Sequence, residues 1–373
     1  MYAFSGDPIT YGHIDIIQRA AKVFDEVVVG IGINPDKKYL FSLEERTEMA
    51  EKSLKTISNA TVTSFKGLLV DYAYENKIPV IIKGVRDEKD FSYETLLHQI
   101  GESQKLDIDT FLLPAEHSKA HISSSAAKAI LKEHGLIHEY VPLYVKQCLE
   151  AKMSQQYFIG VTGEIGAGKS YLCKKFVDFG KDKGMEVHNI ELDHIGHEIL
   201  EKRNEPIYRE VRVNIAKTFG DSVHNADGTI NRKNLGEIVF SDTDKIKILN
   251  EIMQKPIEVR LRKEIFDKKG IILINAALIA ESGMTYLCNN NIVLVSADKS
   301  YQQKRLQERN LTKEQIQRRL VSQCSTNEKT EIIQRNIRRD NQGILWPILN
   351  NDGSDDYLAK NVFEDIIKEL KVK

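Results

Sequence analysis

Residues 157–170 read YFIGVTGEIGAGKS, an apolar run that passes directly into a glycine-rich turn. The apolar run is short and bounded by Gly163, so it predicts a buried strand over residues 157–162. The turn matches the pattern G-x-x-x-x-G-K-S, and a helix is expected to begin near Ser170. Strand, glycine turn and helix in this order are typical of an α/β domain with a parallel sheet.

The same turn predicts a site for a nucleoside triphosphate. Its glycines let the backbone N–H groups point inward at phosphate oxygens, and the helix N-terminus adds a favourable dipole. Lys169 is expected to neutralise charge on the β- and γ-phosphates, and the Ser170 hydroxyl is expected to ligate Mg²⁺. The residues predicted to form this site are Gly163, Glu164, Ile165, Gly166, Ala167, Gly168, Lys169 and Ser170.

Composition limits the classes of protein to consider. The chain has 373 residues, 41% hydrophobic and 29% charged, with a net charge of −1. At about 150 residues per domain, the length predicts two to three domains. The composition argues against disorder, and the small net charge argues against a partner such as nucleic acid or a membrane surface. No apolar run approaches the ~20 residues that a membrane span needs.

The cysteines and the N-terminal residues bear on the compartment. The four cysteines, Cys148, Cys173, Cys288 and Cys324, are scattered and form no Cys-x-x-Cys pair. This usage fits a reducing cytoplasm best. Residues 1–5 lack the basic start of a signal peptide, so we expect a cytoplasmic protein.

Strand and helix signals alternate along the chain and then restart. The first series has a helix around residues 14–23 and strands at 27–33, 79–82 and 110–113. The second series begins at residue 157 and has later strands at 270–274 and 292–295. Two such series predict two tandem doubly wound parallel-sheet α/β domains, residues 1–153 and 157–373, with a polar joint between them.

An acid follows the next expected strand of the second series. Residues 189–193 are predicted to be a strand that ends in Asp193, which would face the glycine turn and accept a hydroxyl proton. Taken alone, an Asp at a strand end more often caps the following helix. No acid stands at Asn275, the end of a later strand, so a second magnesium contact through water, Asp193 or Glu281 stays open.

Two polar motifs mark the first series. Thr10-Tyr11-Gly12-His13 lies at a strand-to-helix turn, where Gly12 permits close approach to phosphate and His13 can donate hydrogen bonds to it. Alone this motif is weak, because a His at a helix N-terminus is commonly only a cap. Ser123, Ser124 and Ser125 support it, because they lead directly into an expected helix from Ala126 rather than into a linker.

Residues 157 to about 353 resemble dephospho-CoA kinases. The resemblance rests on the glycine turn and on an ordered series of short segments that includes IELD at 190–193, DGTINR at 227–232, ALIAE at 277–281 and KR at 304–305. It implies that Asp193 deprotonates the ribose 3′-hydroxyl of dephospho-CoA. It also implies that Arg305 and Arg309 bind ATP from a closing lid and stabilise charge on the transferring phosphoryl group.

Residues 1 to about 150 resemble bacterial-type phosphopantetheine adenylyltransferases. The resemblance rests on the two polar motifs and on PDKK at 35–38, KGVR at 83–86 and DFSYE at 90–94. It implies that His13, Lys37 and Arg86 stabilise the transition state. The remaining residues that it implies are Ser5, Thr10 and Gly12 beside the phosphates, Ser123, Ser124 and Ser125 at the β/γ end, Gly84 and Glu94 at the nucleotide, and Leu68, Leu69 and Lys83 at the second substrate.

Together the two resemblances imply a Rossmann-like nucleotidyltransferase followed by a P-loop kinase. The first domain would transfer the adenylyl group of ATP to 4′-phosphopantetheine, giving dephospho-CoA and pyrophosphate. The second, with Mg²⁺ and ATP, would give coenzyme A and ADP. The expected partners are small molecules, neither nucleic acid nor membrane, and a homo-oligomer through the N-terminal domain stays open.

Two alternatives remain. One is a cytidylyl- or nicotinamide-nucleotide adenylyltransferase fused to an unrelated nucleotide kinase. The other is a sensor in which one domain only binds adenine nucleotide, although the retention of both His13 and Asp193 speaks against it.

Overall fold

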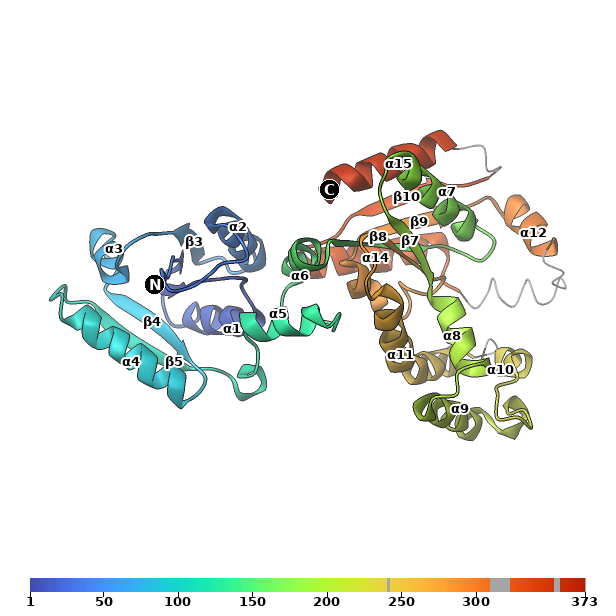
Figure 1. Ribbon diagram of the computed structural model, residues 1–373, viewed down its shortest axis with the longest axis horizontal. Coiled ribbons are helices and arrows are strands. Elements are labelled where there is room, and N and C mark those ends of the chain that lie inside the picture. Colours follow the sequence, from blue (N-terminus) through green and yellow to red (C-terminus); the bar gives the residue numbers. More distant parts are fainter. Residues whose placement is uncertain (240–241, 309–322, 352–355, 373) are drawn as a thin grey trace. The chain divides into compact units, whose positions relative to one another are not determined.

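The computed structural model describes residues 1–239, 242–308, 323–351 and 356–372. The chain divides into two compact units, Met1–Leu149 and Glu150–Lys373, and each contains its own five-stranded sheet (Figure 1). A short π-helix, η2 (Glu150–Ser154), overlaps the polar joint expected from the sequence. The limits 1–153 and 157–373 for the two functional domains stay a prediction.

The first unit is a parallel sheet with the strand order β3-β2-β1-β4-β5. Its strands are β1 (Tyr2–Phe4), β2 (Val27–Ile31), β3 (Ala60–Ser64), β4 (Val80–Val85) and β5 (Asp109–Pro114). Its helices are α1 (Tyr11–Ala20), α2 (Leu43–Leu54), α3 (Leu69–Glu75), α4 (Glu88–Glu102), η1 (His117–Lys119), α5 (Ser124–Lys132) and α6 (Leu143–Leu149).

The strand order places a reversal at the centre of this sheet. The chain moves outward from β1 to β3, then returns to the other side of β1 with β4 and continues to β5. Right-handed crossovers in opposite directions put helices on opposite faces of the sheet. In open α/β sheets ligands bind beyond the carboxyl ends of the strands at such a reversal, which here are β1 and β4.

The second unit is also a parallel sheet, with the order β10-β9-β6-β8-β7. Its strands are β6 (Gln156–Thr162), β7 (Val187–Glu191), β8 (Gly270–Asn275), β9 (Ile292–Ser296) and β10 (Leu345–Leu349). Its helices after η2 are α7 (Lys169–Asp182), α8 (Leu192–Glu201), α9 (Pro206–Phe219), η3 (Asp221–Val223), α10 (Arg232–Val239), α11 (Thr243–Ile265), η4 (Met284–Cys288), α12 (Lys299–Gln307), α14 (Thr326–Asp340) and α15 (Asp356–Glu369).

One face of the second sheet packs against α7 and α15. The buried core there combines strand residues such as Ile159 and Leu273 with Phe176 of α7 and Phe363 of α15, whose rings lie 5.3 Å apart. All seven residues of β6 are buried, as expected for a central strand of a parallel sheet. Because β6 is buried along its whole length, the strand that leads into the glycine turn is held firmly in the core.

The predicted fold class is confirmed, and several element limits differ from prediction. The strand expected over 27–33 ends at Ile31, and the helix expected over 14–23 is α1, Tyr11–Ala20. The strand expected over 189–193 ends at Glu191, so Asp193 lies in the first turn of α8. The serine helix begins at Ser124 rather than Ala126, because Ser123 is the N-cap and its Oγ accepts from the Ala126 N–H at 3.1 Å.

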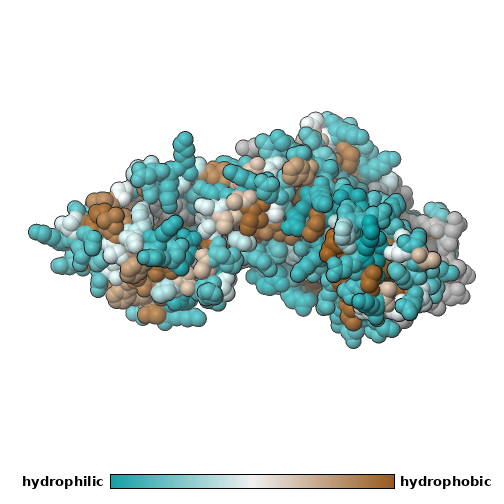
Figure 2. All heavy atoms as spheres, turned by 60° about the horizontal axis from the view of Figure 1, so that its bottom comes forward, coloured by the Kyte–Doolittle hydropathy of each residue, from teal (hydrophilic) through white to brown (hydrophobic). Residues whose placement is uncertain are grey.

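The described helices include none with the length and apolar character to cross a membrane. Figure 2 shows a face made mostly of hydrophilic residues, with separate apolar patches between them.

Cys148, Cys173, Cys288 and Cys324 are all free thiols.

Candidate active sites

The predicted residues of the first unit follow the carboxyl ends of its strands. Ser5 and the Thr10-x-Gly12-His13 motif come after β1, Lys37 comes after β2, and Arg86 comes after β4. Leu68 and Leu69 stand at the start of α3, after β3, and the serine run stands at the start of α5, after β5. The sheet topology therefore gathers these segments at one edge.

The imidazole of His13 is held in one orientation. The backbone N–H of Thr10 donates to its Nδ1 at 3.1 Å, and the ring stacks on Phe4 with centroids 4.4 Å apart. Because Nδ1 accepts this bond, a neutral His13 carries its proton on Nε2. Burial, together with the positive charges of Arg86 and Lys37, lowers the pKa of His13 to about 3. His13 is thus a neutral hydrogen-bond donor beside two cations.

This arrangement predicts a pH dependence of stability. The unfolded chain protonates His13 near its ordinary pKa of 6.5, whereas the folded chain does so only near 3, so the folded state loses stability as the pH falls between these values. We expect the ¹⁵N signals of the His13 ring to keep the neutral Nε2–H pattern from pH 8 to pH 5. A ring that titrates near pH 6.5 in the folded protein contradicts this account.

Two further ion pairs involve predicted residues. Arg86 makes a forked contact to Asp90, with Nε at 2.7 Å and the second guanidinium nitrogen at 3.2 Å from the carboxylate oxygens. Lys83 Nζ lies 2.9 Å from Glu94 Oε2, and both side chains are largely buried. Arg86 and Lys37 are exposed at the sheet edge, where an anionic ligand can reach them.

The structure brings the two polar motifs of the first unit together. A Cβ on Gly12 would lie 3.0 Å from the carbonyl oxygen of Ile122, so α1 and the serine segment meet at a point where only glycine fits comfortably. The Ser124 hydroxyl donates to the Pro8 carbonyl at 2.7 Å, which ties the two helix starts further. Ser125 is exposed.

Two buried charged residues of this unit escaped prediction. Arg46 is 1% exposed, and its guanidinium donates to the carbonyls of Ser5 and Gly32, which fixes the loops after β1 and β2. Asp7 accepts from the Phe41 N–H at 3.0 Å and pairs with Lys128 at 2.9 Å. A sequence signal existed for Arg46, because it shares a helical face with the buried Met49, Ala50 and Leu54.

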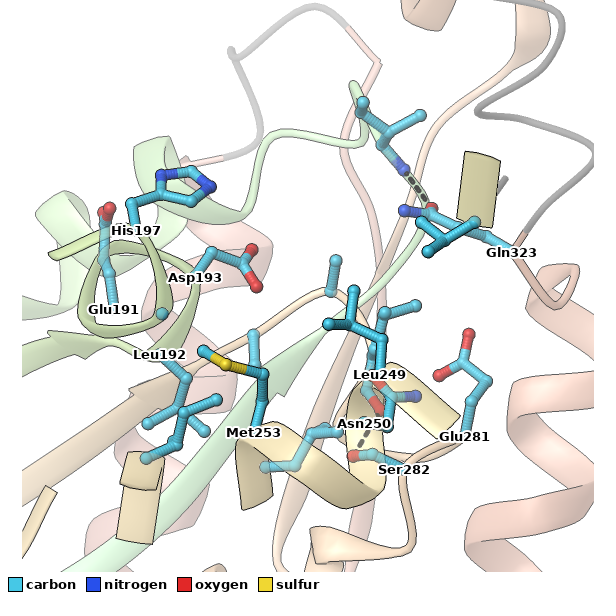
Figure 3. Close-up of a pocket in the computed structure, with 18 of the residues that line it drawn as sticks. Glu191, Leu192, Asp193, His197, Leu249, Asn250, Met253, Glu281, Ser282 and Gln323 are labelled. Atoms are coloured by element: carbon cyan, nitrogen blue, oxygen red, sulfur yellow. Dashed lines mark hydrogen bonds between the residues drawn. The ribbon is translucent and has the colours of Figure 1, made fainter. Parts of the chain in front are cut away.

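The second unit contains a pocket of about 960 Å³. The glycine turn forms one end, α8, α10 and α11 form the other walls, and residues 275–284 close the side (Figure 3). Polar side chains such as Lys169, Asp193 and Glu281 share this pocket with apolar ones such as Leu235 and Met253. The pocket therefore combines a phosphate-type end with walls suited to a larger organic ligand.

The glycine turn has the backbone geometry that its sequence predicts. Lys169 Nζ donates to the carbonyls of Gly163 and Glu164 at 2.9 and 3.1 Å, so the lysine spans the loop. Gly163, Gly166 and Gly168 all have positive φ. A Cβ on Gly163 would lie 2.0 Å from the carbonyl oxygen of Val295, a contact that no side chain can occupy.

This contact makes Gly163→Ala a strongly destabilising change. Gly184 is a matched control, because it also has positive φ (+68°) but a Cβ there meets nothing within 4 Å. We expect Gly184→Ala to lower the unfolding free energy of this unit by about 1 kcal/mol, and Gly163→Ala by at least about 2 kcal/mol more. Urea unfolding of the two variants tests this, and equal losses contradict the predicted clash.

The prediction that Asp193 ends a strand is wrong, because Asp193 lies in the first turn of α8. Its side chain is exposed and lines the pocket, and Figure 3 shows its carboxylate directed into it. One turn later His197 accepts a hydrogen bond from Arg232 at 2.7 Å. Burial and the charge of Arg232 lower the pKa of His197, which keeps it neutral as the acceptor of this bond.

Other predicted residues of this unit hold the loop in place. The Glu164 side chain accepts from Gln302 Nε2 at 2.9 Å and from the Thr326 N–H at 2.8 Å. Burial favours the protonated form of Glu164, but these hydrogen bonds outweigh it and lower the pKa. The Arg305 guanidinium donates at 2.6–3.2 Å to the carbonyls of Gly166, Ala167, Asn350 and Asn351. Arg309 lies outside the described residues.

The first unit matches known adenylyltransferases. A cytidylyltransferase-like family model matches residues 5–130. The phosphopantetheine adenylyltransferase of Clostridium kluyveri is 44% identical over 142 residues, 38% of this chain and 87% of that protein. That of Clostridium tetani is 46% identical over 142 residues, 38% of this chain and 89% of that protein.

The second unit matches a different family. The dephospho-CoA kinase family model matches residues 157–344. The chain belongs to the phosphopantetheine adenylyltransferases through its first unit and to the dephospho-CoA kinases through its second. It is a nucleotidyltransferase and a kinase of coenzyme A biosynthesis, joined in one polypeptide. A solved dephospho-CoA kinase from Campylobacter jejuni, 24% identical, covers 57% of this chain and 98% of its own with a TM-score of 0.35, too low to add to the assignment.

Proposed function

We propose that the first unit transfers the adenylyl group of ATP to 4′-phosphopantetheine and that the second phosphorylates the dephospho-CoA so formed. The observation that carries the proposal is the pairing on one chain of two families whose reactions are consecutive. Dephospho-CoA is the product of the first family's reaction, and it is also the acceptor that the second family phosphorylates. ATP is the expected donor for both units.

In the adenylyltransferase unit the chemistry needs donors aimed at the phosphates of ATP. We expect the Nε2–H of His13 to bond to a phosphate oxygen as negative charge develops, with Lys37 and Arg86 adding positive charge. Ser5, Thr10, Gly12 and the serine run, residues 123–125, are expected to hold the phosphates. Gly84 and Glu94 are assigned to the nucleotide, and Leu68, Leu69 and Lys83 to 4′-phosphopantetheine.

In the kinase unit the P-loop residues 163–170 are expected to hold the β- and γ-phosphates through backbone N–H groups and Lys169. Asp193 accepts the proton of the ribose 3′-hydroxyl as that oxygen attacks the γ-phosphorus. Arg305 acts through the loop carbonyls that it binds, and any contact with nucleotide by Arg305 or Arg309 stays a prediction.

The residues present fit a magnesium ion that arrives with ATP. Among the described residues no group of three His, Cys, Asp or Glu side chains could hold a metal, which suits Mg²⁺ because it keeps waters and phosphate ligands instead. The Ser170 hydroxyl would hold it in the pocket beside Lys169. The ion would supply neutralisation of charge on the β- and γ-phosphates.

Self-association through the first unit and a cytoplasmic location stay predictions. Helix α4 buries none of its residues, and Leu96 and Ile100, which lie one turn apart on one face of it, are about half exposed. An apolar face of this kind is typical of a contact between protein copies. The four free thiols agree with a reducing compartment.

Acceptor specificity tests the proposal. The full-length protein is incubated with ATP and, in separate reactions, 4′-phosphopantetheine or nicotinamide mononucleotide, and the products are separated by chromatography. We expect coenzyme A from 4′-phosphopantetheine and no adenylylated product from the other acceptor. Pyrophosphate release with the other acceptor alone favours the alternative fusion, and nucleotide binding without turnover favours a sensor.

A further inference from the structure

A buried ion pair lies in the wall of the kinase pocket, and one of its members, Glu281, has so far been named only as a candidate magnesium contact. Lys329 of α14 is 0% exposed, and its Nζ donates to the Ala277 carbonyl at 2.8 Å and to Oε1 of Glu281. The Glu281 side chain is 15% exposed and lines the pocket. The lysine therefore fixes both the carboxylate and the pocket segment that precedes it.

The second carboxylate oxygen of Glu281 is unused. Glu281 Oε2 is buried and accepts no hydrogen bond from any of the described residues. Leaving a buried charged acceptor without a donor is costly, so a donor on a bound ligand would gain from meeting it. In Figure 3 the carboxylate stands at one side of the pocket, near Leu249 and Asn250 of α11, with Asp193 on the other side.

The charge of the pair decides what kind of ligand group fits. Both kinase substrates carry phosphates, so a second unpaired carboxylate beside that of Asp193 would add to the repulsion in their pocket. Lys329 neutralises Glu281, so the pocket presents a strong hydrogen-bond acceptor without net negative charge. Such an acceptor suits an O–H or N–H donor and not a phosphate oxygen.

The position of Glu281 in the fold selects between the two substrates. The P-loop follows β6, Asp193 follows β7, and β8 lies between these strands in the sheet. Glu281 belongs to the segment after β8, and its carboxylate stands across the pocket from Asp193 (Figure 3). The acceptor nucleoside must occupy that space for its hydroxyl to lie between Asp193 and the γ-phosphate, and apolar neighbours such as Leu249 and Met253 suit it.

We propose that Glu281 binds the acceptor nucleoside of the kinase by accepting a hydrogen bond from one of its O–H or N–H groups. Lys329 is a positioning residue that orients the carboxylate and cancels its charge. This inference rests on the proposed kinase function and adds an acceptor-binding residue to it.

The test uses Glu281→Gln in the full-length protein, with dephospho-CoA supplied to the kinase directly. Gln keeps the shape of Glu but removes the charge from the acceptor, so we expect the KM for dephospho-CoA to rise roughly tenfold. The KM for ATP and the Mg²⁺ concentration at half-maximal rate should stay within about twofold. The adenylyltransferase activity of the same molecule corrects the rates for the amount of protein, and the melting temperature reports whether the kinase unit is folded.

Two further variants complete the design. Glu281→Gln with Lys329→Met leaves no unpaired buried charge, so it should regain thermal stability while keeping the raised KM for dephospho-CoA. Glu331→Gln, an exposed residue of the same helix, should change neither KM value.

Four results overturn the inference. A shift in the Mg²⁺ dependence would show that Glu281 Oε2 binds metal-bound water. A shift in the KM for ATP would show that it binds the donor nucleotide. Unchanged kinetics with a lower melting temperature make the pair structural only. A raised KM in the single variant that returns to the wild-type value in the double variant makes the unpaired lysine its cause. If the wild-type protein does not phosphorylate dephospho-CoA at all, the proposed function fails instead.

Discussion

His13→Ala is expected to lower kcat for adenylyl transfer by about 10²–10³-fold, the usual loss when one donor to a developing charge is removed. His13 is neutral, is held by the Thr10 N–H at 3.1 Å and carries its proton on Nε2, so it acts as a fixed donor. The kinase activity of the same variant, measured with added dephospho-CoA, should stay within about twofold. Chromatography of dephospho-CoA and coenzyme A follows both steps.

His13→Gln provides the matched control. The Gln amide can donate a hydrogen bond but lacks the fixed ring, so its adenylyl transfer rate should lie between those of the wild type and His13→Ala. If the Ala and Gln variants lose activity equally, or if both lose the kinase as well while remaining folded, His13 is not a donor to phosphate in the first reaction.

Lys169→Ala is expected to block the kinase reaction, which follows adenylyl transfer. Its ammonium group is the cation of the P-loop, and its loss should lower kinase kcat by about 10³-fold. Adenylyl transfer from the first unit should be unchanged, so dephospho-CoA should accumulate when 4′-phosphopantetheine and ATP are supplied. The time courses of both products measure this.

Lys174→Ala is the control for this substitution, because Lys174 lies on the same helix and is exposed outside the pocket lining. It should leave both activities unaltered. Retention of the kinase rate in Lys169→Ala, or loss of adenylyl transfer in it, contradicts the division of the two reactions between the two units.

Contiguous motifs could be predicted from the sequence because local backbone rules determine them. Gly163 and Gly168 occupy positive-φ positions that glycine adopts without strain, and the strand before them is buried over its whole length. The backbone course of the glycine turn was therefore predictable, whereas the phosphate contacts of its residues stay a prediction. The parallel sheets followed from the alternation of strands and helices.

Helix limits were predicted less well, because single caps determine them. Ser123 caps α5 through the Ala126 N–H, so the helix begins at Ser124, two residues earlier than its apolar pattern indicated. Asp193 falls in the first turn of α8 because β7 stops pairing with β8 at Glu191. Neither limit can be derived from hydrophobic periodicity.

The supporting residues of both sites depend on contacts between distant parts of the chain. Arg46 reaches the loops after two different strands, and Lys329 meets Glu281 from a helix 48 positions further along the chain. Their burial on a helical face is visible in the sequence, whereas their partners are set by the sheet order. The contacts of these supporting residues could therefore be found only from the tertiary structure.

The position of the label transferred from ATP tests the central claim most directly. The full-length protein is given 4′-phosphopantetheine with ATP labelled at either the α- or the γ-phosphorus, and the products are separated. We predict that α-label appears in dephospho-CoA and coenzyme A, and that γ-label appears in pyrophosphate and coenzyme A but not in dephospho-CoA. Coenzyme A that contains label from only one of the two positions would contradict the account.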